Sequence, residues 1–450
     1  MTGMLCSIVR AKLISVWIGP AGVGLFAIFN HALDMVSQTA QLSIRQSSVR
    51  TLSAASPSQQ PSVISSIRWW CAILGLGGAA AMLAASPWLS IFSFGTTAWW
   101  WAFAALSVAV LGQVYVAGEQ AIFQGRQQLK ALARSAMWAV VAATALSAPM
   151  YYLMGIDSVV PTIILFPLCA VIATRALRCD PQPRLRQSHR ANYAAGKEYM
   201  RLGLVMSIST IVSASVSYVF LSYLNSKSSE EVTGYYQAGY TILSQYVGVI
   251  FAALAMEYYP RLSAIAHAPG RMSVAVSHEI SLILCVLTPM IVVFEACAVP
   301  VVHILYSSDY SATVPYITIG IGGAVFRAIS YCMSFVIVAR GDGRMYIATE
   351  ASSALIFLGL SILLYSRAGL QGLGWAHVLW FVAYTLITAA AYRHYRLTIR
   401  RRAIAVCAAA IAICAAAIAL RTLGWWQPLC LLPAAGALAI VARRKKRSLG

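Results

Sequence analysis

The sequence predicts an all-α, polytopic membrane protein, and two features of its composition carry that prediction. The chain is 60% hydrophobic and only 10% charged, with a mean hydropathy of +0.73, which is too apolar for a soluble globule of this length. Apolar runs of about 20 residues recur, each long enough to cross about 30 Å of hydrocarbon as a helix. Membrane-spanning strands would instead alternate apolar and polar residues over about ten positions, and the sequence has no such alternation.

The positive charges give the topology. Of the 33 Lys and Arg residues, 27 lie in every second gap between apolar segments or in the tail 443–447. Basic loops that alternate with neutral ones indicate a cytoplasmic and an exterior face. The pattern places both termini in the cytoplasm, and it assigns the +20 net charge to one membrane face rather than to nucleic-acid binding.

About fourteen transmembrane helices are expected. The predicted segments are 4–20, 22–44, 67–92, 99–122, 133–154, 157–175, 199–223, 234–257, 278–305, 313–339, 345–365, 371–392, 403–421 and 425–442. A basic gap at 176–198 follows the sixth segment. It divides the chain into an N-terminal six-helix lobe (1–175), a cytoplasmic linker (176–198), a C-terminal six-helix lobe (199–392) and an accessory hairpin with a basic tail (403–450). Two lobes that enter the membrane in the same direction are expected to surround a central cavity.

The second predicted helix carries the densest polar pattern. Asn30, Asp34, Gln38, Gln41 and Arg45 follow spacings of 4, 4, 3 and 4, which places them on one helical face. Facing lipid, a mid-membrane Asp alone would cost about 2.5–3.5 kcal/mol. One or two amides would serve as hydrogen-bonding contacts between helices, but five polar residues in register favour the wall of a hydrated cavity.

Two arginines lie inside apolar segments. Arg10 is near the start of the first segment, where it either extends to the cytoplasmic surface or faces the cavity. Arg327 lies in mid-segment, with no acidic residue in the same segment to neutralise it. It therefore needs a partner on another helix or an anionic ligand, and we favour the ligand.

Further polar side chains occur on other segments. Gln113 and Gln245 are candidates for contacts with a polar ligand, and Tyr240 is placed either to stack on a sugar or to pack in the core. Asp34, Glu119 and Glu295 are the acids that could exchange a proton or bind sodium, although Glu295 is also a candidate structural partner of Arg327. The ten cysteines show no metal-binding spacing, so neither a metal site nor a cofactor is expected.

The segment Gly19–Leu25, together with Arg10, Lys12 and Leu13 before it, supports a family resemblance. It resembles the R-x-K…LGP-x-GxG pattern of lipid-linked oligosaccharide flippases, the O-antigen translocase branch of the MATE-like exporter superfamily. The motif covers about 25 residues, whereas the topology match covers the whole chain. Many of these flippases have 12 helices; fourteen is typical of the lipid II flippases of the same superfamily.

The resemblance implies a transporter of undecaprenyl-diphosphate-linked oligosaccharide in the bacterial inner membrane. The headgroup would move from the cytoplasmic to the outer leaflet by alternating access, supplying a polysaccharide polymerase and chain-length machinery. Arg10, Arg45 and Arg327 would then bind the diphosphate, because guanidinium groups suit phosphate oxygens. The residues expected to meet sugar hydroxyls are Asn30, Gln38, Gln41, Gln113, Gln245 and Tyr240. The sequence leaves open whether a proton or a sodium ion drives transport.

Two alternatives are weighed against this function. A multidrug exporter of the same superfamily would bind cations and would require acids in its cavity, whereas the intramembrane basic residues here are at least as prominent as Asp34 and Glu295. A membrane-embedded polysaccharide polymerase or ligase would require a sizeable exterior loop. The predicted exterior loops have about ten residues or fewer.

Overall fold

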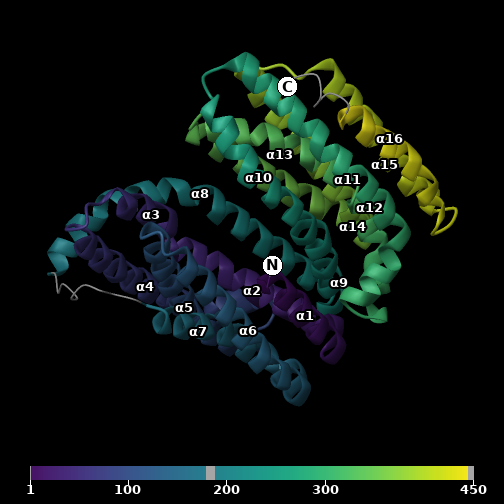
Figure 1. Ribbon diagram of the computed structural model, residues 1–450. Coiled ribbons are helices and arrows are strands. Elements are labelled where there is room, and N and C mark those ends of the chain that lie inside the picture. The colour runs from purple at the N-terminus through teal and green to yellow at the C-terminus, as the bar shows by residue number, and fades with distance from the viewer. Residues whose placement is uncertain (1, 179–187, 444–450) are drawn as a thin grey trace. The chain divides into compact units, whose positions relative to one another are not determined.

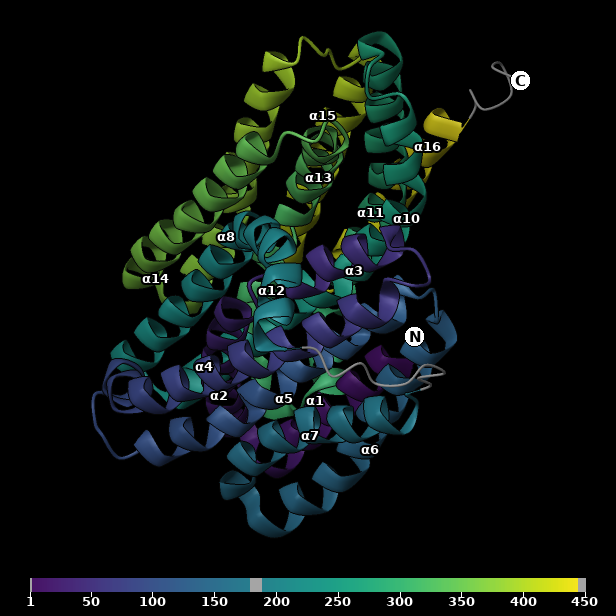
Figure 2. The ribbon, with the colours of Figure 1, turned by 90° about the vertical axis from the view of Figure 1, so that its left-hand side faces the viewer.

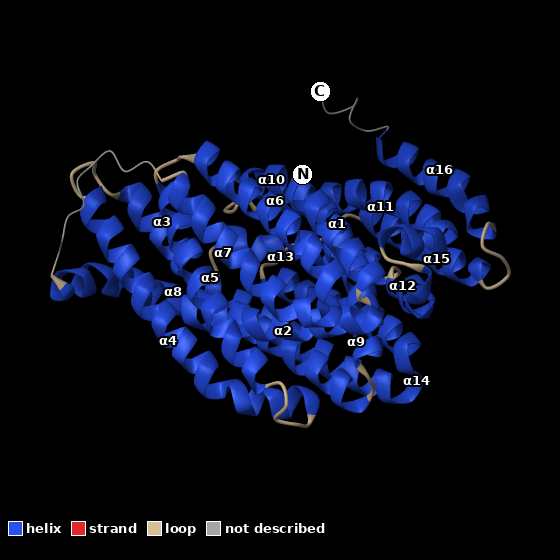
Figure 3. Cartoon of the chain, turned by 90° about the horizontal axis from the view of Figure 1, so that it is seen from below, coloured by secondary structure: helices blue, strands red, loops and turns tan. Residues whose placement is uncertain are grey.

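The computed structural model describes residues 2–178 and 188–443. Within these ranges the chain is helical almost throughout and forms no strand (Figure 3). The all-α polytopic fold class is thereby confirmed, and the protein is a multi-pass membrane protein. The central part of the predicted linker and nearly all of the basic tail lie outside the described residues.

The chain divides into two compact units, residues 1–234 and 235–450. The helices of the first unit are α1 (Thr2–Trp17), α2 (Gly19–Gln41), α3 (Ile44–Ala54), α4 (Gln60–Phe94), α5 (Trp100–Gly125), α6 (Leu129–Met154), α7 (Val159–Ala176), α8 (His189–Lys227) and the start of α9 (Glu230–Tyr240). Helix α4 packs along α5 and α8, and α1 lies against α6 (Figure 2). A short 3-10 turn, Gly155–Ser158, joins α6 to α7, and these two helices pack together.

The second unit begins at the end of α9. It contains a π-helical turn (Thr241–Tyr246), α10 (Val247–Ala264), α11 (Pro269–Leu305), α12 (Val314–Gly320), α13 (Gly323–Ala339), α14 (Gly343–His394), α15 (Arg401–Arg421) and α16 (Leu432–Arg443). Short 3-10 turns precede α12 (Ser308–Thr313) and α16 (Gln427–Leu431). The C-terminal hairpin of α15 and α16 packs on α11 (Figure 1).

The long apolar helix α14 folds back on itself. In α14 the helical path breaks at Ala368 and Gly369, where Gly369 has φ +57°, a conformation that glycine adopts readily. The two arms then run antiparallel, because Trp380 donates to Ser353 and Tyr384 to Glu350. By contrast, α12 and α13 form one bent pair, with 52° between them.

The predicted segments agree with these helices. All fourteen fall on helical chain, and among the described helices eight are long and apolar enough to span a membrane, or nine with the bent pair. The predicted segments 4–20, 22–44 and 425–442 lie on helices outside that set, so their crossing of the membrane stays a prediction. Two of those eight stretches, 129–176 and 343–394, each hold two predicted segments. Helix α3 is an addition, because residues 45–54 were expected to be loop.

The boundary between the compact units differs from the predicted linker. Helix α8, the seventh predicted segment, packs against α2, α3 and α4, so the first unit extends to residue 234. The predicted division into two six-helix lobes describes the order of segments through the membrane and not how the helices pack. It stays a prediction, as does a cavity between the two lobes.

Two glycines set the start of α9 against α2. A Cβ on Gly24 would lie 2.0 Å from the carbonyl oxygen of Glu230, and a Cβ on Gly234 would lie 1.9 Å from that of Pro20. No side chain fits in either place, so the GxG part of the Gly19–Leu25 segment is the surface on which the first turn of α9 rests.

Candidate functional site

The polar face of α2 is open in the structure. Asp34 and Gln38 are exposed, and Asn30 and Gln41 are half-buried, whereas the opposite face, including Ile28, Phe29 and Leu33, is fully buried. The Asn30 amide donates to the carbonyl of Phe26, 2.8 Å away, which leaves its side-chain oxygen available. An exposed carboxylate and amides are too costly against lipid, so within a membrane this face requires water or a polar ligand beside it.

The structure brings two of the predicted residues together. The side chain of Gln113 on α5 hydrogen-bonds to the carboxylate of Asp34 on α2. Gln113 is half-buried, so its side chain lies at the border between the open face of α2 and the interior of the first unit. Asp34 thus keeps an exposed carboxylate that is oriented by one amide.

Arg10 on α1 is surrounded by aromatic rings. Its guanidinium carbon lies 5.2 Å from the ring centre of Phe26 and 5.5 Å from that of Phe166, which stabilises the charge without neutralising it. Among the described residues, no carboxylate lies within ion-pair distance of Arg10. It therefore remains a cation that can bind an anion.

Arg45 does not continue the polar face of α2. The helix ends at Gln41, and Leu42 and Ser43 have φ of +45° and +49°, so the chain turns before α3 begins at Ile44. The predicted spacing of four from Gln41 to Arg45 assumed one continuous helix, and that assumption was wrong. Arg45 is exposed at the start of α3, and its binding role stays a prediction.

Glu119 on α5 is in a buried ionic cluster. Its carboxylate accepts two hydrogen bonds from Arg68, at 2.7 and 3.1 Å, and lies 3.9 Å from Arg178. With 1% of its surface exposed, this carboxylate is compensated by cations and closed to solvent. The geometry gives it a structural function, while ion coupling through Glu119 stays a prediction.

Arg327 on α13 is the corresponding cation of the second unit. Its Nη1 donates to the main-chain carbonyls of Leu243 and Ser244, at 3.3 and 3.1 Å. Both carbonyls belong to the π-helical turn Thr241–Tyr246, where the change of helical pitch frees main-chain oxygens. The rings of Phe251 and Phe381 flank the guanidinium at 5.0 and 5.6 Å.

Two further predicted residues lie at this π-helical turn. Gln245 belongs to the turn and is exposed. Tyr240 immediately precedes it, is half-buried, and packs against Tyr236 with ring centres 5.7 Å apart. Because Tyr236 is itself buried and stacked on Tyr316, one side of Tyr240 belongs to the core, as one of the two sequence-based interpretations expected.

The suggested pairing of Glu295 with Arg327 was wrong. Glu295 on α11 is completely buried, and its partner is Arg421 at the end of α15. One nitrogen of Arg421 donates to the main-chain oxygen of Glu295, and another lies 3.9 Å from its carboxylate. This pair connects the C-terminal hairpin to α11. Arg327, in turn, has no carboxylate within ion-pair distance among the described residues.

Two features were not found by sequence reasoning. Glu350 accepts a hydrogen bond from Tyr384 between the arms of α14, which the spacing within one helix does not reveal. A pocket also lies at the end of the first unit where α4 and α8 end. Its residues come from the α4–α5 connection, the α8–α9 connection and the start of α2, so only the presence of Trp99, Glu230 and Glu231 in those short stretches could have indicated it.

Comparison with solved structures identifies the fold. The chain resembles the lipid II flippase MurJ in an inward closed conformation, with a TM-score of 0.69 and 12% identity over 98% of this chain and 96% of that one. It also resembles an inward-facing multidrug resistance MATE family transporter of the MOP superfamily, with a TM-score of 0.70 and 15% identity over 87% and 94% of the two chains. A eukaryotic MATE transporter matches with a TM-score of 0.58 and 12% identity over 92% and 95%.

Comparison with sequences identifies the family. No curated protein sequence gives a significant match. A family model described as polysaccharide biosynthesis protein matches residues 13–315, which include the glycine-rich start of α2, its polar face and the π-helical turn, though neither Arg10 nor Arg327. Because this match covers well over half of the sequence, the chain belongs to the polysaccharide biosynthesis protein family.

Proposed function

We propose that the protein is a flippase that moves an undecaprenyl-diphosphate-linked oligosaccharide, such as an O-antigen repeat unit, from the cytoplasmic to the outer leaflet of the bacterial inner membrane. It would be a transporter and not an enzyme. The observation that carries the proposal is the pair Arg10 and Arg327. Both are guanidinium groups on helices that the sequence predicts to lie in the membrane, and both are held by aromatic rings or carbonyls instead of carboxylates.

The surroundings of Arg327 are suited to binding a diphosphate. Its Nη1 is used by two carbonyls, so the position of the guanidinium is fixed while its other N–H groups are available to an anion. Charge-assisted hydrogen bonds to phosphate oxygens are strong.

The sugar part of the headgroup requires a hydrated surface with hydrogen-bond donors and acceptors. The open amides of α2, with Gln113 and Gln245, supply donors and acceptors for hydroxyl groups. Asn30 and Gln38 lie within two turns of Asp34 on the same face. A large polar headgroup could follow such a face without displacing apolar side chains.

Energy coupling is proposed at Asp34. Of the three candidate acids, Glu119 and Glu295 are buried beside arginines, whereas Asp34 is exposed and contacts an amide. A proton or a sodium ion can reach an exposed carboxylate, and binding of either would remove its charge. The polymerase and chain-length machinery remain predicted partners.

The family and the fold support this proposal at different levels. Membership of a polysaccharide biosynthesis family agrees with a sugar-carrying substrate, and one solved structure of this fold is described as a lipid II flippase. Other proteins of the fold are multidrug transporters. A cationic drug would be repelled by Arg10 and Arg327, so their charge favours the anionic lipid.

A cellular experiment tests the proposal. In a host deleted for the gene, lipid-linked repeat units should accumulate on the cytoplasmic leaflet and surface polysaccharide should disappear. The wild-type gene should reverse both effects, and Arg327→Ala should reverse neither at equal expression. If complete units reach the outer leaflet and remain unpolymerised, the protein acts as a polymerase or ligase, and the proposal fails.

A further inference from the structure

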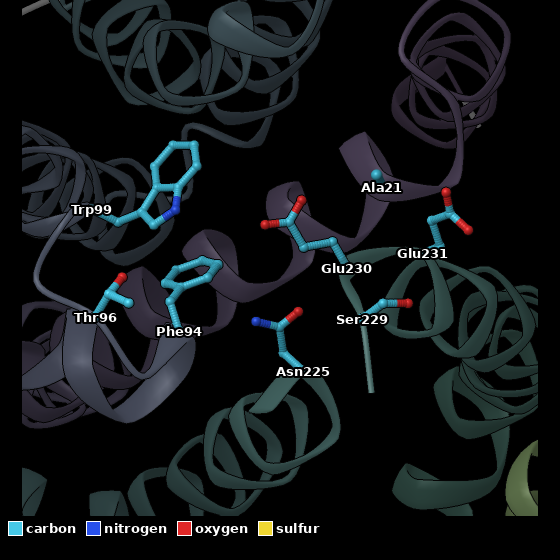
Figure 4. A pocket seen from close by; sticks show the side chains of 8 residues that line it. All are labelled: Ala21, Phe94, Thr96, Trp99, Asn225, Ser229, Glu230 and Glu231. Carbon is cyan, nitrogen blue, oxygen red and sulfur yellow. The ribbon is translucent and has the colours of Figure 1, made fainter. Parts of the chain in front are cut away.

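A pocket of about 630 Å³ lies at one end of the first unit. It is formed where α4 gives way to α5 and where α8 gives way to α9, and the start of α2 closes it. The lining residues are Ala21, Phe94, Thr96, Trp99, Asn225, Ser229, Glu230 and Glu231 (Figure 4). Connections at this end of the unit carry almost no basic residues, so the charge pattern predicts that the pocket opens on the exterior side.

The aromatic wall of the pocket is fixed. The ring centres of Phe94 and Trp99 lie 5.5 Å apart, and Phe29 lies 5.8 Å from each. Ser90 locks the connection between the rings, because its hydroxyl donates to the carbonyl of Thr96 at 2.7 Å and accepts from the N–H of Trp99 at 3.2 Å. A wall held in this way needs little ordering when a ligand binds.

Asn225 leaves a hydrogen-bond acceptor unused. Its side-chain nitrogen donates to the carbonyl of Ser93 at 2.9 Å, which fixes the amide. Its Oδ1 is buried and has no hydrogen-bond partner. A buried acceptor without a partner costs about 1–3 kcal/mol, and a donor entering the pocket would recover that cost.

The acidic side of the pocket comes from the first turn of α9. In Figure 4 the carboxylate of Glu230 lies between Phe94 and Ala21, and Asn225 points toward the same space. The close contact of Gly24 with the carbonyl of Glu230 holds this turn on α2. Glu230 and Glu231 also complement the helix N-terminus, but a capping function alone does not require an aromatic wall or an acceptor without a partner opposite.

We propose that this pocket binds a neutral or basic saccharide. The apolar C–H face of a sugar ring packs on Phe94 and Trp99, while its hydroxyl groups donate to Asn225 Oδ1 and to the Glu230 carboxylate. The volume falls within the roughly 300–1,000 Å³ of small-ligand sites. Two carboxylates repel acidic sugars and diphosphates, so this pocket complements the arginines and does not duplicate them.

The chemical class of the ligand follows from the pocket alone, whereas its use in transport rests on the proposed function. If the protein is a flippase, the pocket receives the glycan after it has crossed the membrane. The diphosphate, which the pocket repels, would remain at membrane depth. The specificity that results concerns the sugar: a repeat unit whose exposed residues are neutral or basic is accepted, and one ending in a uronic acid is disfavoured.

Binding can be tested on the full-length protein in nanodiscs, without any transport step. Saturation-transfer NMR would be recorded with diacetylchitobiose, glucosamine and glucuronic acid as probes. We expect transfer to the first two and an affinity for glucuronic acid about tenfold lower, which corresponds to repulsion by carboxylates within about 6 Å at an effective dielectric constant near 40. Trp99→Ala and Asn225→Leu should each lower saturation transfer at least fivefold.

Matched controls separate the site from general effects. Trp100→Ala removes an exposed neighbouring ring outside the pocket and should leave saturation transfer unchanged. The double substitution Glu230→Gln and Glu231→Gln should abolish the discrimination against glucuronic acid, which a purely structural role of these glutamates would not do. Equal binding of all three probes to the wild type, or transfer unaffected by Trp99→Ala, would overturn the proposal. That result would leave the flippase proposal intact, because binding and flipping are measured separately.

Discussion

The Nη1 of Arg327 donates to the main-chain carbonyl of Ser244, 3.1 Å away, inside a π-helical turn. A carbonyl dipole orients a guanidinium without cancelling its charge, which a carboxylate in the same place would do. The apolar rings of Phe251 and Phe381 complete this environment. Arg327 is thereby fixed in position and remains a full cation within the membrane helices, the property on which the proposed diphosphate site depends.

Replacing Arg327 by alanine and by lysine should distinguish the contribution of its charge to transport from that of its shape. We expect Arg327→Ala to lower the flipping rate at least about tenfold, equivalent to the loss of one charge-assisted contact of about 1.4 kcal/mol. Arg327→Lys should retain part of the activity because the cation remains. Arg344→Ala, at an exposed arginine at the start of α14, is the control. Normal activity in Arg327→Ala at normal expression would exclude a role in binding.

The buried pair Glu295 and Arg421 should contribute to stability and not to transport. Arg421→Met leaves the Glu295 carboxylate buried without its cation, which costs roughly 3–5 kcal/mol, and should lower the thermal unfolding temperature in detergent. The double variant Glu295→Met with Arg421→Met should recover much of that loss. The exposed Arg367 offers a control in Arg367→Met. A double variant as unstable as the single one would indicate that the pair is not the cause.

Asp34 and Glu119 should respond differently to neutralisation. Asp34→Asn keeps the contact with Gln113 but removes an exposed charge, so transport should lose its dependence on an imposed proton or sodium gradient while the fold remains stable. Glu119→Gln should lower the unfolding temperature, because Arg68 loses its buried partner, and should keep the gradient dependence. If Glu119→Gln instead abolished the gradient dependence in proteoliposomes while Asp34→Asn kept it, the coupling site would be Glu119 and not Asp34.

Gly24 should tolerate no side chain. In Gly24→Ala the new methyl group would lie 2.0 Å from the carbonyl oxygen of Glu230, so the first turn of α9 must move away from α2. We expect a lower unfolding temperature and weaker saccharide binding in the pocket at the start of α9. Gly77→Ala is the matched control, since its Cβ would meet no atom within 4 Å and alanine favours a helix by about 1 kcal/mol. Equal stability of both variants would contradict the packing of α9 on α2.

The loop before α14 should show a pH-dependent contribution to stability. The N–H of Met345 and then the hydroxyl of Tyr395 hydrogen-bond to Asp342 and lower the pKa of that carboxyl. Burial, followed by the same hydrogen bond, raises the pKa of Tyr395 to about 12. The Asp342 contribution is therefore complete above its unfolded pKa of about 4 and is lost as pH falls through the lower folded value. That of Tyr395 is complete below about pH 10 and is lost toward pH 12.

Asp342→Ala measures this contribution. It should cost about 1 kcal/mol of stability at pH 7, as expected for a lost helix cap, and the difference from the wild type should shrink below about pH 4. Asp309→Ala is the comparison, because that aspartate is also outside the long helices and its carboxylate accepts a hydrogen bond from the hydroxyl of Ser307. A difference between Asp342→Ala and wild type that does not vary between pH 3 and pH 7 would show that the hydrogen bonds to the carboxylate do not matter.

The helices could be predicted because apolar length and loop charge report directly on a membrane. Sequence periodicity also identified the open face of α2 correctly as far as Gln41. It failed at Arg45, because Leu42 and Ser43 adopt left-handed conformations that neither residue type signals. Periodicity could not identify partners on different helices: Glu295 pairs with Arg421, 126 residues away. The pocket likewise joins two connections and the start of α2, which only the folded unit brings together.

The most direct test of the central claim is a flipping assay with purified protein. Proteoliposomes would contain a fluorescent polyprenyl-diphosphate disaccharide, and the fraction accessible to a membrane-impermeant quencher would be followed over time. We predict that the wild type exposes the inner-leaflet lipid while empty liposomes and the Arg327→Ala protein do not, and that the same disaccharide on a neutral polyprenol lacking the diphosphate is not moved. Equal movement of the neutral lipid, or full activity without Arg327, would contradict recognition of the diphosphate by a cation within the membrane.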